Sequence, residues 1–210
     1  MNYRTIRKES QRRLRNAKVP EHPNLPLLDE YPQRSAQDVA RRIVALYCLT
    51  GLANGASGSA MLDWIQTESL EGYFEPEELG ALAGPTPTEE QLSALSWCQE
   101  SLYAGVWSMA LIHDLAWPDA ECSLDPVFPR IPPEVDAGSF ILDASLRSAE
   151  QLVHAADLYY CLDAALRHGE LWGGAPVESR YPMVQIVMER RRIFEWIMQT
   201  GRWSDVVLDT

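Results

Sequence analysis

The sequence predicts an all-α fold, and two kinds of observation support this prediction. Apolar residues recur at steps of three and four in several long stretches, which is the period of an amphipathic helix. No stretch combines strict alternation of apolar and polar residues with the β-branched residues typical of strands. The chain has 210 residues, of which 46% are hydrophobic, so it can bury a sizeable core. We therefore expect one compact, bundle-like domain spanning residues 1–210.

The first 33 residues are expected to add a basic helix and a proline-rich strap to this core. Residues 3–17 are predicted to form a short amphipathic helix, with Ile6 and Leu14 as its apolar contacts. Residues 19–33 contain four prolines. Because proline lacks the N–H group that a helix requires, this strap is predicted to be extended.

Capping residues, together with glycine or proline breaks, predict where the remaining helices begin and end. Thr88, for example, is followed at Gln91 by the partner that completes a capping box. The predicted helices span 35–53, 59–70, 75–84, 88–114 and 182–200. A proline-rich loop of about thirty residues follows Trp117-Pro118 and is predicted to contain helical turns near 124–128 and 139–144.

The strongest helix-start signal in the chain precedes a long helix predicted over 148–168. Ser148 is a good N-cap with Gln151 as its capping-box partner, and Gly169 is a C-terminal stop. A second glycine break is expected at Gly173-Gly174. The apolar stripe of this helix is predicted to face the core: Leu152, Ala155, Tyr159, Leu162 and Leu166. The reverse side carries Glu150, His154, Asp157 and Cys161.

The segments 34–49 and 147–162 resemble each other when they are aligned without a gap. Arg34, Ser35, Ala36, Tyr47, Cys48 and Leu49 fall on Arg147, Ser148, Ala149, Tyr160, Cys161 and Leu162. One interpretation is an internal helical repeat. The other is convergence, because any capped amphipathic helix draws on the same residue types.

Arg190 lies in the middle of the apolar stripe predicted for the last helix. A buried guanidinium is costly unless a carboxylate meets it, so we expect an ion pair between Arg190 and either Asp157 or Glu150. Arg191 is placed to pair with Glu195, four residues further along the same helix.

Charge is unevenly distributed along the chain, whose net charge is −12. Residues 1–18 hold seven bases and one acid, whereas residues 43–129 hold thirteen acids and neither Lys nor Arg. The net charge argues against nucleic-acid binding. Two interpretations of the acidic span stay open: the basic N-terminal helix neutralises it within the chain, or it binds a basic protein partner.

The cysteine pattern and the apolar runs predict a cytoplasmic protein. The four cysteines are widely spaced and include no C-x-x-C pair, which is typical of a reducing compartment. The basic start lacks the apolar region of a signal peptide. No apolar run approaches the ~20 residues of a membrane span, so no membrane association is expected. There is no phosphate-binding glycine loop and no G-x-S-x-G motif, and we expect no cofactor.

Several motifs along nearly the whole chain resemble a bacterial family, the domain of unknown function 4272 family. They are Arg7-Lys8, Asn24-Leu25-Pro26, Arg34-Ser35, Val39-Ala40-Arg41-Arg42, Glu100 to Trp107, Arg147-Ser148-Ala149-Glu150, Asp157-Leu158-Tyr159-Tyr160, Glu189-Arg190-Arg191, Trp196, Trp203 to Val206 and Asp209-Thr210. Ser204 departs from the Trp-Asp usual at that position. The resemblance implies a bacterial, cytoplasmic origin and supplies no reaction.

Two functions from different classes are compatible with these residues. The first is a non-enzymatic interaction protein, such as an immunity or antitoxin-like protein, that binds a basic partner. Its candidate binding residues, for which a structural role is the alternative, are Arg147, Asp157, Tyr160, Arg190, Trp203 and Asp205. The second is a metal-dependent hydrolase built on Glu150, His154 and Asp157, with His113-Asp114 as further ligands. Ordinary helix capping and ion pairing account for the same residues, so no metal is expected.

Overall fold

The computed structural model describes residues 1–28, 31–168, 170 and 180–209, and these residues form helices, turns and loops without any strand. The predicted all-α fold is therefore confirmed. The chain forms two compact units, each assembled from segments that are far apart in the sequence. The prediction of one domain stays a prediction. The glycine breaks predicted at Gly169 and Gly173-Gly174 lie outside the described residues.

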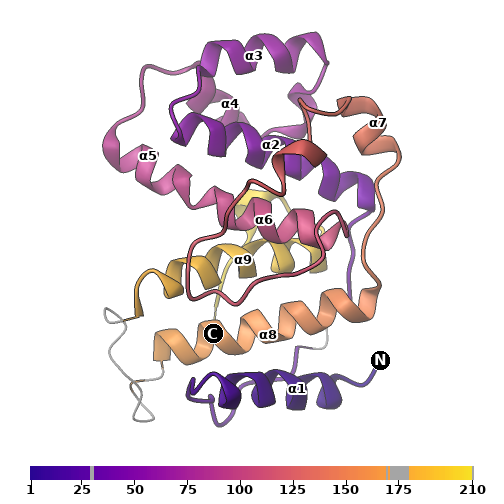
Figure 1. The fold of residues 1–210 in the computed structure, drawn as a ribbon, viewed down its shortest axis with the longest axis vertical. Coiled ribbons are helices and arrows are strands. Elements are labelled where there is room, and N and C mark those ends of the chain that lie inside the picture. The colour runs from indigo at the N-terminus through magenta and orange to yellow at the C-terminus, as the bar shows by residue number, and fades with distance from the viewer. Residues whose placement is uncertain (29–30, 169, 171–179, 210) are drawn as a thin grey trace. The chain divides into compact units, whose positions relative to one another are not determined.

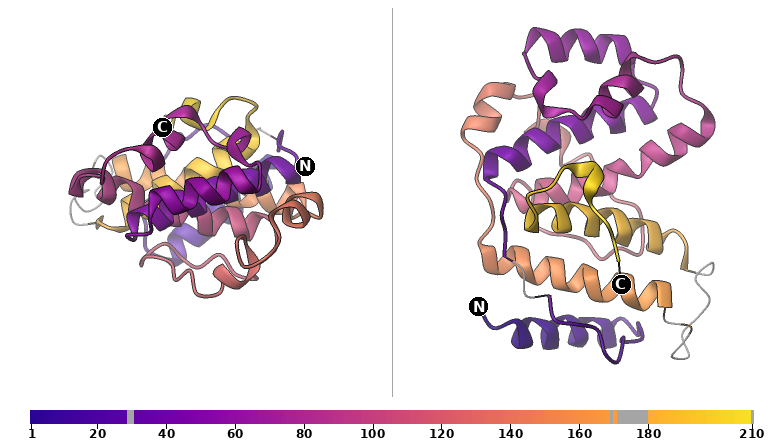
Figure 2. Two further views of the ribbon diagram at one scale, coloured as in Figure 1. Left: turned by 90° about the horizontal axis from the view of Figure 1, so that it is seen from above. Right: turned by 180° about the vertical axis from the view of Figure 1, so that it is seen from behind.

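Unit 1 consists of Met1–Arg34, Ala116–Glu121 and Arg147–Thr210. Its elements are α1 (Tyr3–Asn16), α8 (Ala149–His168), α9 (Met183–Met198) and the 3-10 turn η5 (Trp203–Asp205). Within this unit α8 packs against both α1 and α9 (Figures 1 and 2). Because α8 has a neighbour on either side, it is buried around most of its circumference. Asp157 and Cys161, on the side of α8 opposite its predicted apolar stripe, are therefore buried as well.

Unit 2 consists of Ser35–Leu115 and Cys122–Leu146. Its elements are α2 (Ala36–Ala53), α3 (Gly58–Thr67), η1 (Glu71–Tyr73), α4 (Pro76–Ala83), α5 (Glu89–Ser96), α6 (Cys98–Ser108), η2 (Phe128–Arg130) and α7 (Ala137–Leu142). Here α2 is the central helix, and it packs against α4, α5, α6 and α7. α3 packs mainly on α4 (Figure 1).

Local hydrogen bonds explain why the helices begin where the sequence predicts. Ser35 caps α2 and forms a capping box with Asp38. Thr88 and Gln91 form the same box at the start of α5. At the start of α8, the backbone N–H of Gln151 donates to Ser148 Oγ while Ser148 N–H donates back to the Gln151 side chain. Each box satisfies N–H groups that a helix terminus leaves without partners.

The long helix predicted over 88–114 is wrong in two respects. Trp97 separates α5 from α6, and α6 ends at Ser108. The chain then turns through Ala110, whose φ of 58° lies in the left-handed region that ends a helix. Neither break carries a glycine or a proline, so the usual helix-ending residues do not predict them. The turns predicted in the proline-rich loop are present as η2 and α7.

The helices α3 and α4 approach so closely that a glycine is required between them. A Cβ atom at Gly58, the first residue of α3, would meet the carbonyl oxygen of Leu82 in α4. A Cβ atom at Gly80, within α4, would meet no atom within 4 Å. The two glycines therefore form a matched pair for testing the packing of unit 2.

We expect Gly58→Ala to lower the free energy of unfolding by about 1–3 kcal/mol, because the backbone of α4 must move away. Gly80→Ala is expected to raise it by up to about 1 kcal/mol through helix propensity. Chemical denaturation followed by circular dichroism measures both. Equal effects of the two substitutions would contradict the close approach of α3 and α4.

Candidate functional site

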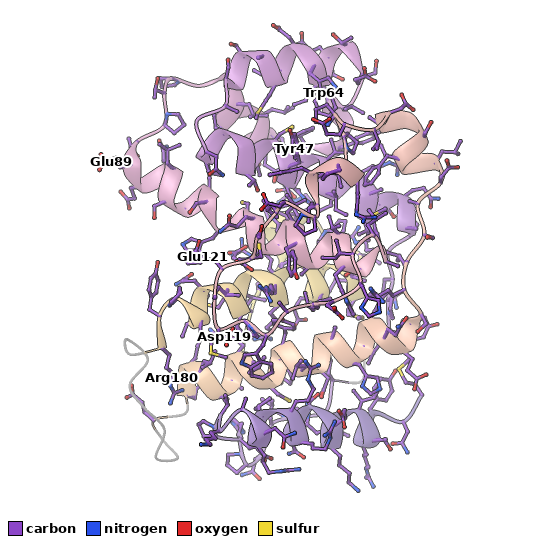
Figure 3. All side chains as sticks on the ribbon, in the orientation of Figure 1. Tyr47, Trp64, Glu89, Asp119, Glu121 and Arg180 are labelled. Carbon is purple, nitrogen blue, oxygen red and sulfur yellow. The ribbon has the colours of Figure 1, made fainter. Side chains whose placement is uncertain are left out.

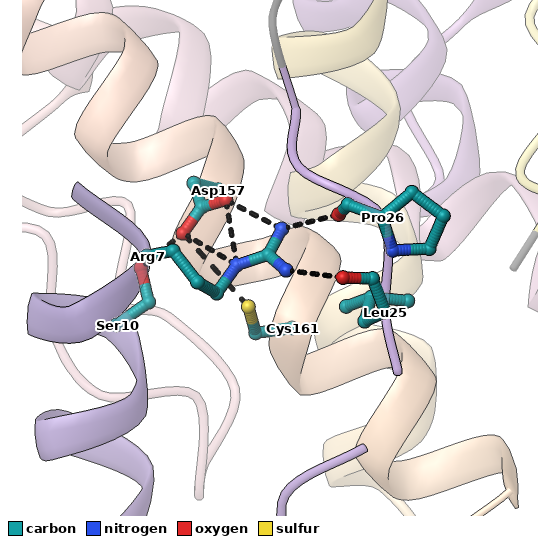
Figure 4. A network of polar contacts seen from close by, with 6 residues as sticks. All are labelled: Arg7, Ser10, Leu25, Pro26, Asp157 and Cys161. Carbon is teal, nitrogen blue, oxygen red and sulfur yellow. Dashed lines mark hydrogen bonds and ion pairs between the residues drawn. The ribbon is translucent and has the colours of Figure 1, made fainter. Parts of the chain in front are cut away.

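A buried polar cluster in unit 1 centres on Arg7 of α1 and Asp157 of α8 (Figure 4). Arg7 Nη2 lies 2.8 Å from Asp157 Oδ1, and Arg7 Nε lies 3.0 Å from the same oxygen. The guanidinium also donates to the backbone carbonyls of Leu25 and Pro26, at 2.8 and 2.7 Å. One side chain therefore joins α1, the strap and α8.

The Asp157 carboxylate receives further donors besides Arg7. Ser10 Oγ donates to Asp157 Oδ2 at 2.6 Å, and the Cys161 thiol lies 3.8 Å from the same oxygen. Asp157 is 2% exposed and Arg7 is 7% exposed. Burial alone would lower the pKa of Arg7, but the hydrogen bond to Asp157 raises this pKa above its ordinary value. The Arg7 guanidinium therefore stays charged despite its burial.

Arg190 is fully buried as predicted, but its predicted partner is wrong. Arg190 Nη1 donates to the Tyr159 hydroxyl at 3.0 Å and to the carbonyl of Ala116 at 2.6 Å. Asp157 is bound by α1 instead, and Glu150 is exposed in the first turn of α8. Two positions along a helix differ by about 200°, so Asp157 and Tyr159 point to opposite sides of α8. Only the Tyr159 side faces α9.

A second buried charge cluster joins α8, α9 and the C-terminal tail. Arg191 of α9 forms a short ion pair with Asp163 of α8. Arg191 also donates to Glu195 at 2.9 Å, which confirms the predicted pair within α9. Arg167 bonds to the same oxygen of Asp163 at 2.5 Å. Burial raises the pKa of Glu195, although the charge of Arg191 opposes this effect.

The same arginines hold the C-terminal tail against α8 and α9. Arg167 donates to the carbonyl of Leu208 at 2.6 Å, and Arg191 donates to the carbonyl of Asp209 at 2.9 Å. Trp203 packs against Trp196 with ring centroids 6.1 Å apart, so an aromatic contact also ties the tail to α9. Figure 2 shows the tail folded back beside α9.

Tyr160 lies between the two charge clusters. The Arg7 guanidinium carbon lies 5.7 Å from the centroid of the Tyr160 ring, and that of Arg191 lies 4.9 Å from it. Such distances allow cation–π attraction on the ring. Burial raises the pKa of Tyr160, while the two arginines oppose the shift. The ring therefore has a packing role between the clusters.

The six candidate binding residues do not form one exposed site. Asp157 and Arg190 are buried, and Tyr160 is partly buried between the two clusters. Their described contacts hold unit 1 together. Asp205 is exposed and bonds to Arg202 at 3.1 Å in η5. Arg147, Asp157, Tyr160, Arg190, Trp203 and Asp205 thus include several residues whose contacts account for a structural role.

The proposed metal ligands are not brought together either. Glu150 is exposed, His154 is half-buried, and both oxygens of Asp157 already accept hydrogen bonds. His113 and Asp114 contact each other at 2.7 Å on an exposed loop of unit 2. Within the described ranges, no three His, Cys, Asp or Glu side chains are grouped to hold a metal ion.

Sequence reasoning missed Arg7, Ser10 and Asp163 as members of these clusters. A signal for the first two was present in the spacing. Arg7, Ser10 and Leu14 recur at steps of three and four, so they share the face of α1 that buries Leu14. The local signal for Asp163 is its i,i+4 spacing with Arg167. Its other partner, Arg191, lies 28 positions away and could not be inferred from spacing.

The fold and these clusters define an all-α protein whose charged motif residues serve largely to join its helices. No helix among the described residues is long and apolar enough to cross a membrane. A family model described as Domain of unknown function (DUF4272) matches residues 6–206, and the chain belongs to that family. Neither a protein of curated function nor a solved structure matches the chain.

We expect Asp157→Asn to lower the free energy of unfolding by about 3–5 kcal/mol, because it leaves the Arg7 charge buried without a counter-charge. Denaturation in urea measures the loss. Glu9→Gln is the control, since it removes the exposed pair between Glu9 and Arg12 and should change stability little. A similar small effect of both substitutions would show that the buried pair does not stabilise unit 1.

Thiol reactivity should differ between the buried and the partly exposed cysteines. Burial raises the pKa of Cys48 and of Cys161 from 9.0 to about 12. At pH 8 this shift lowers their thiolate populations on the order of 1000-fold. Iodoacetamide should therefore label Cys98 and Cys122 in the folded protein, and label Cys48 and Cys161 only after unfolding. Mass spectrometry of the labelled peptides measures this order, and early labelling of Cys161 would contradict its burial beneath α1.

Proposed function

We propose that the protein is a non-enzymatic, cytoplasmic bacterial interaction protein whose acidic surface binds a basic protein partner. The observation that carries the proposal is a set of exposed acids on α3, η1, α4 and α5 of unit 2. We call this set the acidic surface: Asp63, Glu68, Glu71, Glu77, Glu89 and Glu90. A cationic toxin is one partner of this chemistry, and it would make the protein immunity-like.

The acidic surface is distinct from the acids that the fold itself uses. Glu78 pairs with Arg42 of α2 at 2.5 Å, and both side chains are buried. Glu100 is fully buried and accepts a hydrogen bond from the backbone of Cys122 at 2.7 Å. By contrast, none of the six acids of the acidic surface has an ion pair within the described part of the chain. Figure 3 shows Glu89 projecting outward from α5.

The ion pairs of α1 support this proposal over internal neutralisation. Arg7 pairs with Asp157, Arg12 pairs with Glu9, and Arg15 pairs with Glu21. All three acids lie outside residues 43–129. The arginines of α1 that form ion pairs therefore use acids of their own unit and leave the charge of the acidic surface available.

Like charges within one unit repel each other, so a basic partner would relieve that repulsion on binding. Such a surface also accelerates association with a cationic protein, and added salt screens the effect. Binding driven by the acidic surface is therefore expected to weaken steeply with ionic strength.

The proposal is tested by affinity capture from an extract of the native host at low and at high salt. We expect one basic protein to be recovered at low salt and lost at high salt. With that protein purified, the triple variant Glu68→Gln, Glu77→Gln, Glu90→Gln should bind it at least about tenfold more weakly.

The control variant removes the same amount of charge from unit 1, at Asp119→Asn, Glu150→Gln and Asp209→Asn, all of which are exposed. This variant should bind like the unaltered protein. Equal losses in the two variants would assign the effect to net charge and contradict a defined acidic surface. Recovery of no basic protein in either salt condition would overturn the proposed function.

A further inference from the structure

Unit 2 contains a cavity of about 270 Å³ between α7 and the segment that follows α6. Apolar side chains form much of its wall: Met109, Leu111, Val135, Phe140 and Ala144. A cavity of roughly 150 Å³ already admits a benzene ring, so this one has room for a larger aromatic side chain. Its dimensions therefore fit one anchoring residue of a partner.

Two exposed apolar side chains lie in the same segment, 122–146, as most of the residues that line the cavity. Leu142, the last residue of α7, is 76% exposed, and Phe128 in η2 is 39% exposed. Leu142 is directly followed by Asp143 and Ala144, which line the cavity. Exposed apolar residues at the edge of a hollow are typical of contact sites for proteins.

The charge around this cavity selects the kind of partner. Residues 122–146 contain four acids, at 125, 134, 136 and 143, and one base, Arg130. Asp136, Asp143 and Arg130 line the cavity itself, so acids outnumber bases in its lining by two to one. A hydrogen bond from the backbone of Ser139 lowers the pKa of Asp136, which keeps this carboxylate charged. Arg130 bonds to the carbonyl of Pro126 and forms no ion pair with another described residue.

We propose that this cavity receives an aromatic or large apolar side chain of a basic protein, while flanking Lys or Arg residues meet Asp136 and Asp143. The inference rests on the proposed function and adds an anchoring site to it. A second copy of this chain fits the site poorly, because each copy carries a net charge of −12. Buried aromatic anchors surrounded by polar contacts dominate the binding energy of many interfaces.

The test uses blocked synthetic peptides and two-dimensional NMR of the full chain labelled with ¹⁵N. The probes are Lys-Lys-Trp-Lys-Lys, the same peptide with Ala in place of Trp, and Glu-Glu-Trp-Glu-Glu. We expect the first to shift the amide signals of Leu111, Phe140 and Ala144. The alanine peptide should bind at least about tenfold more weakly, and the acidic peptide should cause no shifts.

Two variants and one matched control locate the site. Ala144→Trp fills the cavity, and Asp143→Lys reverses a charge on its rim, so each should weaken binding of the tryptophan peptide at least about tenfold. Asp125→Lys makes the same charge change in the same segment but outside the cavity lining. It should leave binding within about twofold. Thermal unfolding of each variant verifies that it is folded.

The outcomes separate this inference from the proposed function. If the tryptophan and alanine peptides bind equally and shift signals of α3 to α5, the anchoring cavity is refuted while the acidic surface stands. If the tryptophan peptide causes no shifts around the cavity, the inference fails as well. In either case, the proposed function would still be supported if a basic partner is captured and the triple variant Glu68→Gln, Glu77→Gln, Glu90→Gln binds it more weakly.

Discussion

Burial of charge on both sides of α8 is the constraint on which unit 1 depends. A helix packed between two others has little contact with water, so each ionised side chain on it must find a counter-charge within the fold. Asp157 pairs with Arg7 on one side of α8, and Asp163 pairs with Arg191 on another. These pairs fix which face of α8 meets which neighbour. Apolar packing alone tolerates rotation or sliding of a helix more readily than a buried ion pair does.

The central helices of the two units, α2 and α8, resemble each other in their caps, their burial and their ion pairs. α2 and α8 each follow an Arg-Ser pair, and the serine caps the helix in both. At the aligned positions 34–36 and 147–149, and again at 47–49 and 160–162, the two segments have the same pattern of burial. Each central helix also contributes to a buried ion pair, since Arg42 of α2 meets Glu78 of α4. This agreement in burial is what either a repeat or a shared packing requirement would produce.

Features encoded locally could be predicted from the sequence, and features that depend on distant partners could not. Ser148 and Gln151 lie in the same turn, so their capping box is visible in the sequence. The burial of Arg190 follows from its apolar neighbours in α9, but its contacts with Tyr159 and Ala116 depend on how α8 is oriented. The orientation is set by Arg7, about 150 residues from Asp157. Motif residues alone could not distinguish a binding site from such internal pairing, and a cavity made from three separate segments leaves no pattern in the sequence.

The attachment of the C-terminal tail has a consequence for how the chain tolerates change. Arg167 and Arg191 donate hydrogen bonds to the backbone carbonyls of Leu208 and Asp209, respectively. The side chains of Val207 and Asp209 face solvent. Every residue type has a backbone carbonyl, so substitutions in the tail should change its attachment little. Deletion is different, because it would remove one hydrogen-bond acceptor from each of the Arg167 and Arg191 guanidinium groups. The attachment of the tail therefore depends on its length and not on its residue types.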